Sequence, residues 1–453
     1  MVLIGLDRHM SPATRAGFNL TVKRFAGLPY RHLFRKSWSF SESEFWKYQN
    51  ARLSEIYNDA RLEVPHYRDN PISYPDLESV SLPERLRVLP ILEKREVKSA
   101  IDDFRMEKPL PFTSYHTTSG TSGSPVRLAA SLPERSFSQA ALESWYERLC
   151  GKRHPRTLFL SGFMTPTPGD DRLFWRDRVT GATYLSIYSM NQANREVISQ
   201  LLMLADPDLI YGYASAVHQL ALLFRDNPAF GWKNRIAVVT SEVLEPHWRE
   251  LIEQVICRRV FNLYSSQEGS HCVQECPEGS LHINPLIGIV EIVDQNGAPV
   301  PNGSMGEVVI TSLRRRSMPL IRYRLGDSAV STGYSAACSC GLMWPTIGEI
   351  QGRSEDLVRA RDGRSIGYLC FHATKNLSGI KEAQLLQLGF EQFLFRIVPS
   401  ETEAFARETV EALTRGEIEK RIKYPVSLSF EYLDAVPRGA NGKFKAVVVE
   451  TFS

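Results

Sequence analysis

Long hydrophobic runs are missing from this sequence of 453 residues. No apolar stretch approaches the roughly 18–20 residues that a membrane-spanning helix needs, so we expect no membrane partner. The first six residues, Met1-Val2-Leu3-Ile4-Gly5-Leu6, carry no basic residue ahead of the apolar run, and no cleavage site follows. This pattern argues against a secretory signal peptide, and we expect a cytoplasmic protein.

Charge of one sign and cysteine are also scarce. The net charge is only +3, and the densest basic cluster, Arg314-Arg315-Arg316, is too short for a nucleic-acid footprint, so we expect no nucleic-acid partner. The seven cysteines are not expected to form disulfides in the cytoplasm, where thiols are kept reduced. Their positions must therefore be explained by packing or by metal binding.

What is present is enough apolar material for a large core. Hydrophobic residues make up 43% of the chain, which indicates two or three domains. Residues from about 10 to 105 have helical patterns, and Ser41 is the expected N-cap of a helix that runs to about Leu62. Short apolar segments then alternate with helical patterns up to about residue 310, which indicates an α/β domain with a largely parallel sheet. The expected strands are 156–160, 209–213 and 236–240, and the expected helices are 193–205, 214–224 and 246–257.

A strand-rich piece at 288–312 follows, with turn signals at Asp294–Gly297 and Pro301–Gly303. After Gly352 the pattern changes to a tail with strands and helices of its own. We therefore expect a large N-terminal α/β domain of several subdomains over residues 1–352. A small α+β domain is expected over residues 353–453.

The run Thr117 to Arg127 is rich in hydroxyls and glycines and lies between two strand-like segments. Glycine allows the main chain to approach a ligand closely, so the N–H groups and hydroxyls of such a turn can surround an anion. The Gly-Lys-[Ser/Thr] ending of a Walker A loop is absent. A solvated linker is the alternative interpretation of the run by itself.

Four further segments carry groups suited to nucleotide chemistry. Each is also compatible with an ordinary turn, or with a solvated lysine, when it is taken alone. The segments are Asn262–Gly269, Ile321–Asp327, Gly348–Asp356 and Val436–Lys443.

In this order and at these separations, the five segments resemble the adenylate-forming ligase superfamily of acyl-CoA synthetases, luciferases and peptide-synthetase adenylation domains. The branch of phenylacetate–CoA ligases and CapK-like proteins is the closer match, through Val64–Arg68, Leu89–Lys94 and Ile321–Asp327. The resemblance covers roughly residues 40–453. It implies a large domain, a small mobile C-terminal domain and a two-step reaction that consumes ATP.

The resemblance also implies roles for individual residues. Those expected to hold the phosphates of ATP are Ser119, Gly120, Thr121, Ser122 and Gly123. Glu268 would hold Mg²⁺, and Tyr264 would border the adenine with Ser265 beside it in the nucleotide site.

In the second half of the chain, Asp327 would accept hydrogen bonds from the ribose, and Arg353 would contact the ribose or a phosphate. Glu355 matches the hinge of the small domain. Lys443 would reach the α-phosphate and carboxylate oxygens when that domain closes, because a cation on a flexible side chain can enter and leave the site as the domain moves. The catalytic set is thus Lys443, Glu268 and Arg353.

The sequence departs from the family pattern in three places. The glycine-rich loop lacks the lysine often found there, and Arg127 is the only nearby cation. Leu325 stands before Gly326-Asp327 where threonine is usual, and the Tyr264–Glu268 segment replaces a commoner Gly-Ser/Thr-Thr-Glu ending. No essential charge is lost, so an active enzyme is expected.

The cysteines indicate a structural zinc site within a strand region at about 270–342. Four soft ligands in a Cys-x₅-His plus Cys-x-Cys-Gly pattern suit a tetrahedral Zn²⁺ ion, and no open position is implied. The predicted ligands are Cys276, His282, Cys338 and Cys340. His271 or Cys272 is an alternative ligand, and unconnected thiols are the alternative to a metal site.

The sequence indicates less clearly which carboxylic acid is activated and which acceptor receives the acyl group. Tyr211, Tyr213 and Ser241 are the predicted acyl-pocket residues, although strand tyrosines also serve as ordinary packing. Transfer to CoA is favoured, with an amine, a hydroxyl or a carrier protein as alternative acceptors. A zinc-bearing scaffold that binds a nucleotide without turnover is the third hypothesis, and a monomer and a homodimer are both compatible with the sequence.

Overall fold

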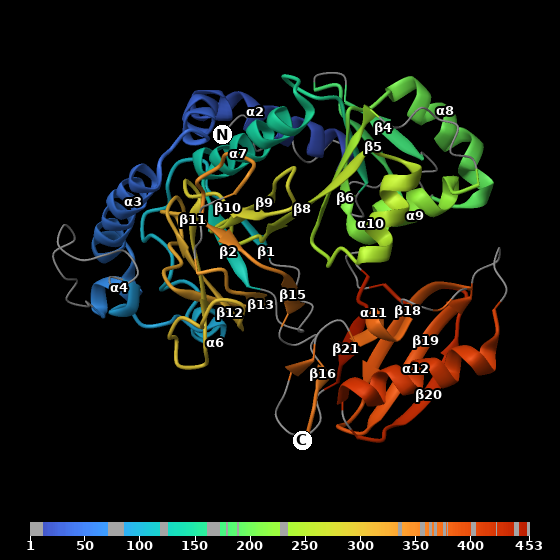
Figure 1. The fold of residues 1–453 in the computed structure, drawn as a ribbon. Helices are drawn as coiled ribbons and strands as arrows, with labels where there is room; N and C mark the ends of the chain where they lie inside the picture. Colours follow the sequence, from blue (N-terminus) through green and yellow to red (C-terminus); the bar gives the residue numbers. More distant parts are fainter. Residues whose placement is uncertain are drawn as a thin grey trace. The chain divides into compact units, whose positions relative to one another are not determined.

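The computed structural model of this chain describes most of its residues (Figure 1). Contacts divide the chain into two compact units. The first comprises Met1–Leu244, Trp248–Leu325 and Ala329–Glu349, and the second comprises Glu245–His247, Gly326–Ser328 and Ile350–Ser453. The described residues are 12–70, 86–117, 126–160, 173–177, 180–187, 190–226, 234–333, 338–353, 358–361, 365–366, 369–374, 377, 379–399, 405–422, 424–438 and 444–450.

A nine-stranded sheet organises the first unit, in the order β14-β10-β9-β8-β7-β6-β3-β5-β4. Strands β5, β3, β6, β7 and β8 are parallel, as expected from the alternating pattern, whereas β4, β9, β10 and β14 join antiparallel. The strands are β3 (Thr157–Leu160), β4 (Phe174–Arg176), β5 (Thr183–Leu185), β6 (Leu209–Tyr213), β7 (Ile236–Thr240), β8 (Arg259–Ser265), β9 (Cys272–Glu275), β10 (Leu281–Ile283) and β14 (Thr346–Ile347).

Helices connect the parallel strands. They are α8 (Arg195–Ala205), which follows the 3-10 turn Gln192–Asn194, α9 (Ala214–Phe224) and α10 (Pro246–Val255). Helix α9 packs on β6 and β7. All five residues of β7 are buried, because a parallel sheet that is covered on both faces needs a continuous apolar run.

The N-terminal part is helical, as expected. It contains α2 (Pro12–Ser37), α3 (Glu42–Glu63), α4 (Pro65–Asp69) and α6 (Lys94–Ser99). Ser41 caps α3 as predicted: its hydroxyl accepts from the Glu44 N–H, and the Glu44 carboxylate accepts from the Ser41 N–H. None of the helices that the structure describes is both long and apolar enough to cross a bilayer.

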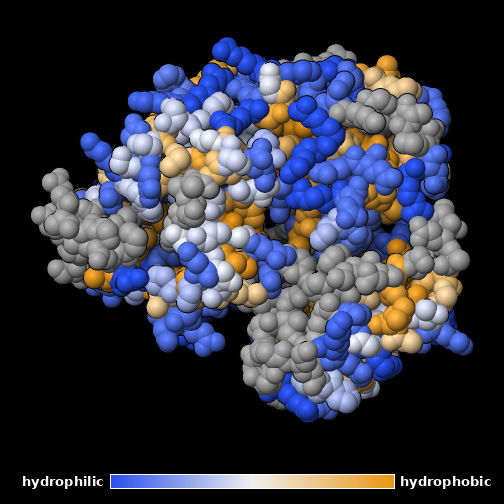
Figure 2. All heavy atoms as spheres, viewed as in Figure 1, coloured by the Kyte–Doolittle hydropathy of each residue, from blue (hydrophilic) through white to orange (hydrophobic). Residues whose placement is uncertain are grey.

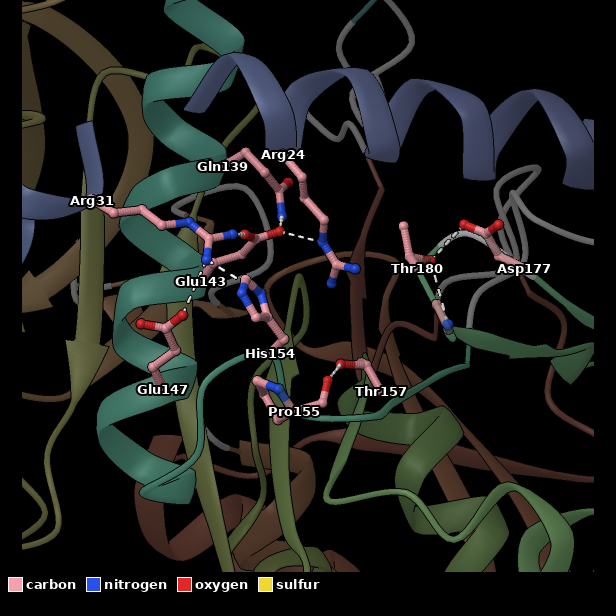
Figure 3. Close-up of polar contacts among 11 residues, drawn as sticks. Arg24, Arg31, Gln139, Glu143, Glu147, His154, Pro155, Thr157, Asp177 and Thr180 are labelled. Atoms are coloured by element: carbon pink, nitrogen blue, oxygen red, sulfur yellow. Dashed lines mark hydrogen bonds and ion pairs between the residues drawn. The ribbon is translucent and has the colours of Figure 1, made fainter. Parts of the chain in front are cut away.

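Helix α2 is held on α7 (Leu132–Cys150) by a buried ion-pair network, drawn in Figure 3. The Arg31 guanidinium contacts both Glu143 and Glu147, the latter at 3.1 Å, and it is only 5% exposed. Arg24 also pairs with Glu143, and Arg35 with Glu147 at 2.7 Å. Each buried carboxylate therefore meets two cations, which satisfies charges that would otherwise be costly to bury.

Replacing Arg31 with methionine should lower the free energy of unfolding by about 3 kcal/mol, because two buried carboxylates lose a shared partner. The matched control is Arg68→Met, at a pair with Glu107 in which both side chains are exposed, and we expect it to change little. Urea denaturation monitored by circular dichroism measures both variants. An unchanged midpoint for Arg31→Met would show that solvent already screens the network.

Other strands carry several of the motifs. Strands β1 (Ser114–Thr117) and β2 (Arg127–Ala130) form an antiparallel pair. A four-stranded sheet has the order β11-β12-β13-β15, with β11 (Gly288–Val293), β12 (Met305–Ser312), β13 (Tyr323–Val330) and β15 (Ile350–Arg353).

The basic cluster Arg314-Arg315-Arg316 is dispersed by this fold. The Arg314 guanidinium lies 4.1 Å from the Phe137 ring centre, and Arg316 pairs with Asp59 at 2.8 Å. Arg315 is buried. The three side chains thus point to three different surroundings and form no continuous basic surface. On the face seen in Figure 2, hydrophilic side chains predominate around α2, with smaller hydrophobic patches between them.

The second unit is built on another four-stranded sheet, in the order β20-β19-β18-β21. Phe393, Phe395, Ile418 and Ile422 form part of its own core. Its elements are β16 (Val358–Arg359), β17 (Ser365–Ile366), α11 (Leu369–Thr374), β18 (Ile380–Gln387), β19 (Gln392–Pro399), α12 (Arg407–Ile422), β20 (Ser427–Tyr432) and β21 (Val447–Val449).

Candidate active site and metal centre

The glycine-rich segment connects two strands that are held side by side. In the β1–β2 pair, Thr117 lies opposite Arg127, so both ends of the connection are fixed by the sheet. The predicted phosphate-binding residues themselves, Ser119 to Gly123, lie outside the described residues. The preceding strand is nevertheless tied to another predicted segment, because His116 Nε2 lies 3.1 Å from the Gln267 carbonyl oxygen.

That second segment is the turn after β8, which carries the predicted magnesium ligand Glu268. Gly269 has a φ of +60°, and a Cβ built on it would lie 1.9 Å from a guanidinium nitrogen of Arg315. Only glycine allows this backbone conformation together with such a close approach. The turn is thus shaped by Arg315 on one side and by His116 on the other.

The predicted acyl-pocket residues lie at the carboxyl edge of the parallel strands. Tyr213, Thr240 and Leu263 are neighbours across β6, β7 and β8, and Ser241 and Tyr264 follow directly. Ligands of open α/β sheets bind at this edge. Tyr211 lies two residues earlier on β6, where burial raises the pKa of its phenol to about 12 and Thr240 provides a hydrogen bond.

Next to this edge is a histidine that sequence reasoning considered only as an alternative zinc ligand. The His271 ring lies 4.6 Å from the Tyr264 ring, and burial lowers the pKa of His271 to about 3. Neither of its ring nitrogens has a hydrogen-bond partner, and the buried Ser266 hydroxyl has none either. No sequence pattern distinguishes this histidine from its neighbours, because its lack of partners is a property of the packing alone.

The remaining predicted nucleotide and hinge residues belong to the later part of the chain. Asp327 is half-buried on β13 and follows Gly326, whose φ is +90°. Arg353 ends β15, the neighbour of β13 in the four-stranded sheet, and its side chain lies outside the described part. Glu355 and Lys443 also lie outside it.

The motif Ile321–Asp327 contains a structural arginine as well. Arg322 adopts a φ of +50° and is 4% exposed, and its guanidinium pairs with the Glu291 carboxylate at 2.9 Å. It also donates to the carbonyl groups of Leu89 and Gly297. Arg322 thereby joins the segment Leu89–Lys94 to β11 and β13, so this part of the motif stabilises the fold.

The four predicted zinc ligands come together in space. The ligand atoms of Cys276, His282, Cys338 and Cys340 all lie within 4.8 Å of one another. Cys276 Sγ is 3.8 Å from Cys338 Sγ, and Cys340 Sγ is 3.4 Å from His282 Nε2. Tetrahedral Zn²⁺ with ordinary bond lengths requires edges of about 3.8 Å and 3.5 Å for these two pairs. The residues present therefore fit such an ion.

The surroundings of the cluster orient its ligands. His282 Nδ1 lies 3.2 Å from the Trp344 carbonyl oxygen, which leaves Nε2 as the free lone pair. Cys276 and Cys338 each begin a tight turn that ends in glycine, since the N–H groups of Gly279 and Gly341 donate back to their carbonyls. Both glycines have positive φ angles. The two turns present their sulfur atoms to one point.

Neither alternative ligand joins this cluster. The Cys272 sulfur accepts a hydrogen bond from Gln274 at 3.4 Å, and His271 packs on Tyr264. Burial, together with the neighbouring sulfurs of Cys338 and Cys276, raises the pKa of Cys340 to about 12. A bound cation would favour the thiolate form of such a cluster.

Comparison with known proteins shows which families this chain resembles. Residues 358–450 match the family described as the CapK C-terminal domain. The chain is 22% identical to Protein CapK of Staphylococcus aureus over 410 residues, which cover 88% of each chain. A phenylacetate-coenzyme A ligase of Thermus thermophilus is 33% identical over 132 residues, 28% of this chain and 29% of that one.

A solved structure of 2-hydroxyisobutyryl-CoA ligase, in the postadenylation state with R3-HIB-AMP, aligns with 92% of this chain and 92% of its own. The TM-score is 0.71 and the sequence identity is 20%. The chain is therefore a homologue of CapK and of the phenylacetate–CoA ligases, and it has the fold of the adenylate-forming CoA ligases. These findings confirm the resemblance and the α/β fold class predicted from the sequence.

Proposed function

We propose, from this relationship to CapK and to the phenylacetate–CoA ligases, that the chain is an AMP-forming acid ligase. The observation that carries the proposal is the meeting of several predicted segments within one adenylate-forming fold. The β1 strand before the glycine-rich segment touches the Glu268 turn through His116 and Gln267. The predicted acyl-pocket residues share the carboxyl edge of β6 and β7 with Tyr264 on β8.

In the proposed first step, a carboxylate oxygen of the acid attacks the α-phosphorus of ATP. The bond from that phosphorus to the bridging oxygen breaks, which gives an acyl-adenylate and pyrophosphate. Positioning and charge neutralisation supply most of the rate in such a transfer. We assign phosphate contacts to Ser119–Gly123 and the ribose contact to Asp327, and Lys443 would stabilise the charge that develops at the α-phosphate.

Glu268 would hold Mg²⁺, whose chemistry is to neutralise the phosphate charge. Arg353 would add a contact to the ribose or a phosphate, and Glu355 would serve as the hinge about which the small domain rotates. In the second step the acyl group passes to an acceptor, for which we favour the thiol of CoA. An amine, a hydroxyl or a carrier protein is the alternative acceptor.

We further propose that Cys276, His282, Cys338 and Cys340 hold a structural Zn²⁺ ion. With four protein ligands the ion would have no open position for substrate, so its role would be to stabilise the fold. It would join the β9–β10 hairpin to the segment that precedes β14.

Exchange of labelled pyrophosphate into ATP tests the ligase proposal. We expect exchange only when a suitable carboxylic acid and Mg²⁺ are both present, because reversal of the first step requires the acyl-adenylate. A panel of aryl, aliphatic and hydroxy acids identifies the substrate class, and CoA, amines and carrier proteins are then compared as acceptors. Folded protein that shows no exchange with any acid would favour the nucleotide-binding scaffold.

A further inference from the structure

Three cations cluster beside the candidate phosphate site without a carboxylate partner. They are Lys23 on α2, Arg135 in the first turn of α7, and Arg315 after β12. Helix α2 packs on α7 at Gly27, where an added Cβ would lie 2.9 Å from the Ser136 carbonyl oxygen, and Ser317 donates hydrogen bonds to Glu134, so the three cations stand on segments that are in contact. In keeping with this placement, burial and then the charges of Arg135 and Arg315 lower the pKa of Lys23. Among the described residues, no acidic group lies within ion-pair distance of any of them.

The other cations on the same helix provide a contrast. Arg24 and Arg31 meet Glu143 of α7 (Figure 3), and Arg35 meets Glu147. Lys23 is adjacent in sequence to Arg24, yet it reaches no carboxylate in the part of the chain that the structure describes. The fold thus neutralises one side of α2 and leaves a local excess of positive charge at Lys23.

The two nearest acidic groups do not remove this excess. The Glu134 carboxylate already accepts hydrogen bonds from the Ser131 N–H and from both the N–H and the hydroxyl of Ser317. Glu134 and then Glu268 act on Arg315, and Glu134 also acts on Arg135, but burial still lowers the pKa of both guanidinium groups. The Nε of Arg315 has no hydrogen-bond partner in the part of the chain that the structure describes. Arg135 makes only a long hydrogen bond of 3.4 Å to the Ser131 carbonyl.

Arg315 is buried, whereas Lys23 and Arg135 are half-buried. Cations withdrawn from water without a partner cost free energy unless an anion joins them. Burial, followed by the charges of Arg135 and Arg315, lowers the pKa of Lys23 to about 8. An anion among the three groups would remove both their mutual repulsion and the loss of hydration.

The position of the cluster indicates which anion. Arg315 lies against Gly269, next to Glu268, and His116 adjoins the first residues of the glycine-rich segment. Charges of Arg315, Arg135 and Lys23 also act on His116, so the cluster adjoins the β1 strand that leads into this segment. The segment itself lacks a lysine, and α2 lies before the part of the chain that resembles the family. Helix α2 therefore adds a lysine to a cluster at the Glu268 turn, whereas the glycine-rich segment contains no lysine.

We propose that Lys23, Arg135 and Arg315 form a subsite for the β- and γ-phosphates of ATP and for the pyrophosphate that leaves. The assignment rests on the proposed ligase function. When the bond between the α-phosphorus and the bridging oxygen breaks, the electron pair stays on that oxygen and adds negative charge to the departing pyrophosphate. Cations already in place stabilise this charge without reorganisation.

Titration calorimetry with magnesium pyrophosphate and, separately, with AMP tests this subsite. Lys23→Met should weaken pyrophosphate binding by about 10- to 100-fold, the usual loss for one charged hydrogen bond. AMP binding should be unchanged, because AMP lacks the distal phosphates. Lys23→Arg should restore most of the affinity. The matched control is Lys36→Met on the same helix, where the lysine is exposed, and it should bind both ligands like the wild type.

Equal pyrophosphate affinity in the wild type and Lys23→Met would overturn the subsite, as would wild-type protein that binds no pyrophosphate. Equal loss of AMP and pyrophosphate binding would show a general structural role for Lys23 and would also overturn it. Pyrophosphate exchange separates this inference from the ligase proposal. Exchange that survives Lys23→Met with an unchanged KM for pyrophosphate refutes only the subsite. Lys23-dependent binding without exchange for any acid refutes only the ligase.

Discussion

Replacing Lys443 with alanine is expected to slow acyl-adenylate formation by about 10²–10³-fold, roughly 3 to 4 kcal/mol in activation free energy. The reason is that its ammonium group would stabilise negative charge that builds at the α-phosphate only in the transition state. ATP binding and the melting temperature should stay nearly unchanged. Pyrophosphate exchange with the best acid of the panel measures the first half-reaction.

The second half-reaction separates a role of Lys443 in acyl-adenylate formation alone from a role in both half-reactions. Started from supplied acyl-adenylate, transfer to the acceptor should be much less affected, because the small domain is then expected to have rotated about Glu355 and withdrawn the lysine. Lys420→Ala is the matched control, since that side chain is 69% exposed on α12. Equal losses in both half-reactions would refute the two-conformation mechanism, and no loss in either would make Lys443 an ordinary surface lysine.

Loss of a zinc ligand is expected to have the largest effect on stability. We expect about one Zn²⁺ per chain by elemental analysis of protein prepared without chelator. Cys340→Ser should reduce the zinc content and the thermal stability of the protein, because structural zinc supplies apparent folding free energies on the order of 10 kcal/mol in small domains. Removal of the ion by a chelator should have the same effect on the wild type.

Cys150→Ser is the control for this experiment. Cys150 is also partly buried and has a raised pKa, but it lies outside the four-ligand cluster. It should keep its zinc and unfold close to the wild-type temperature. Wild-type protein without zinc would refute the metal assignment, and equal destabilisation by both substitutions would attribute the effect to thiol packing.

Local patterns predicted much of the fold because they depend on neighbours along the chain. The apolar runs of β6 and β7 are strands with the expected bounds, and α9 covers the expected range 214–224. Ser41 and Glu44 form the expected capping box, which needs only a three-residue spacing. The sequence pattern does not predict the antiparallel strands that extend the sheet beyond β8, because a short apolar segment does not specify the strand with which it pairs.

In the candidate site, too, residue type and spacing predict some features, and packing decides the others. The sequence by itself determined the motif order and the family resemblance, and it predicted a set of four soft ligands with His271 or Cys272 as an alternative, since residue type and spacing carry that information. Only the tertiary structure decided that His271 and Cys272 lie outside the metal cluster, and that Arg322 is bonded within the core. It alone placed Lys23 beside Arg135 and Arg315, on elements far apart in the chain. These outcomes depend on which side chains share a low-dielectric space, and a sequence does not specify that until its elements are packed.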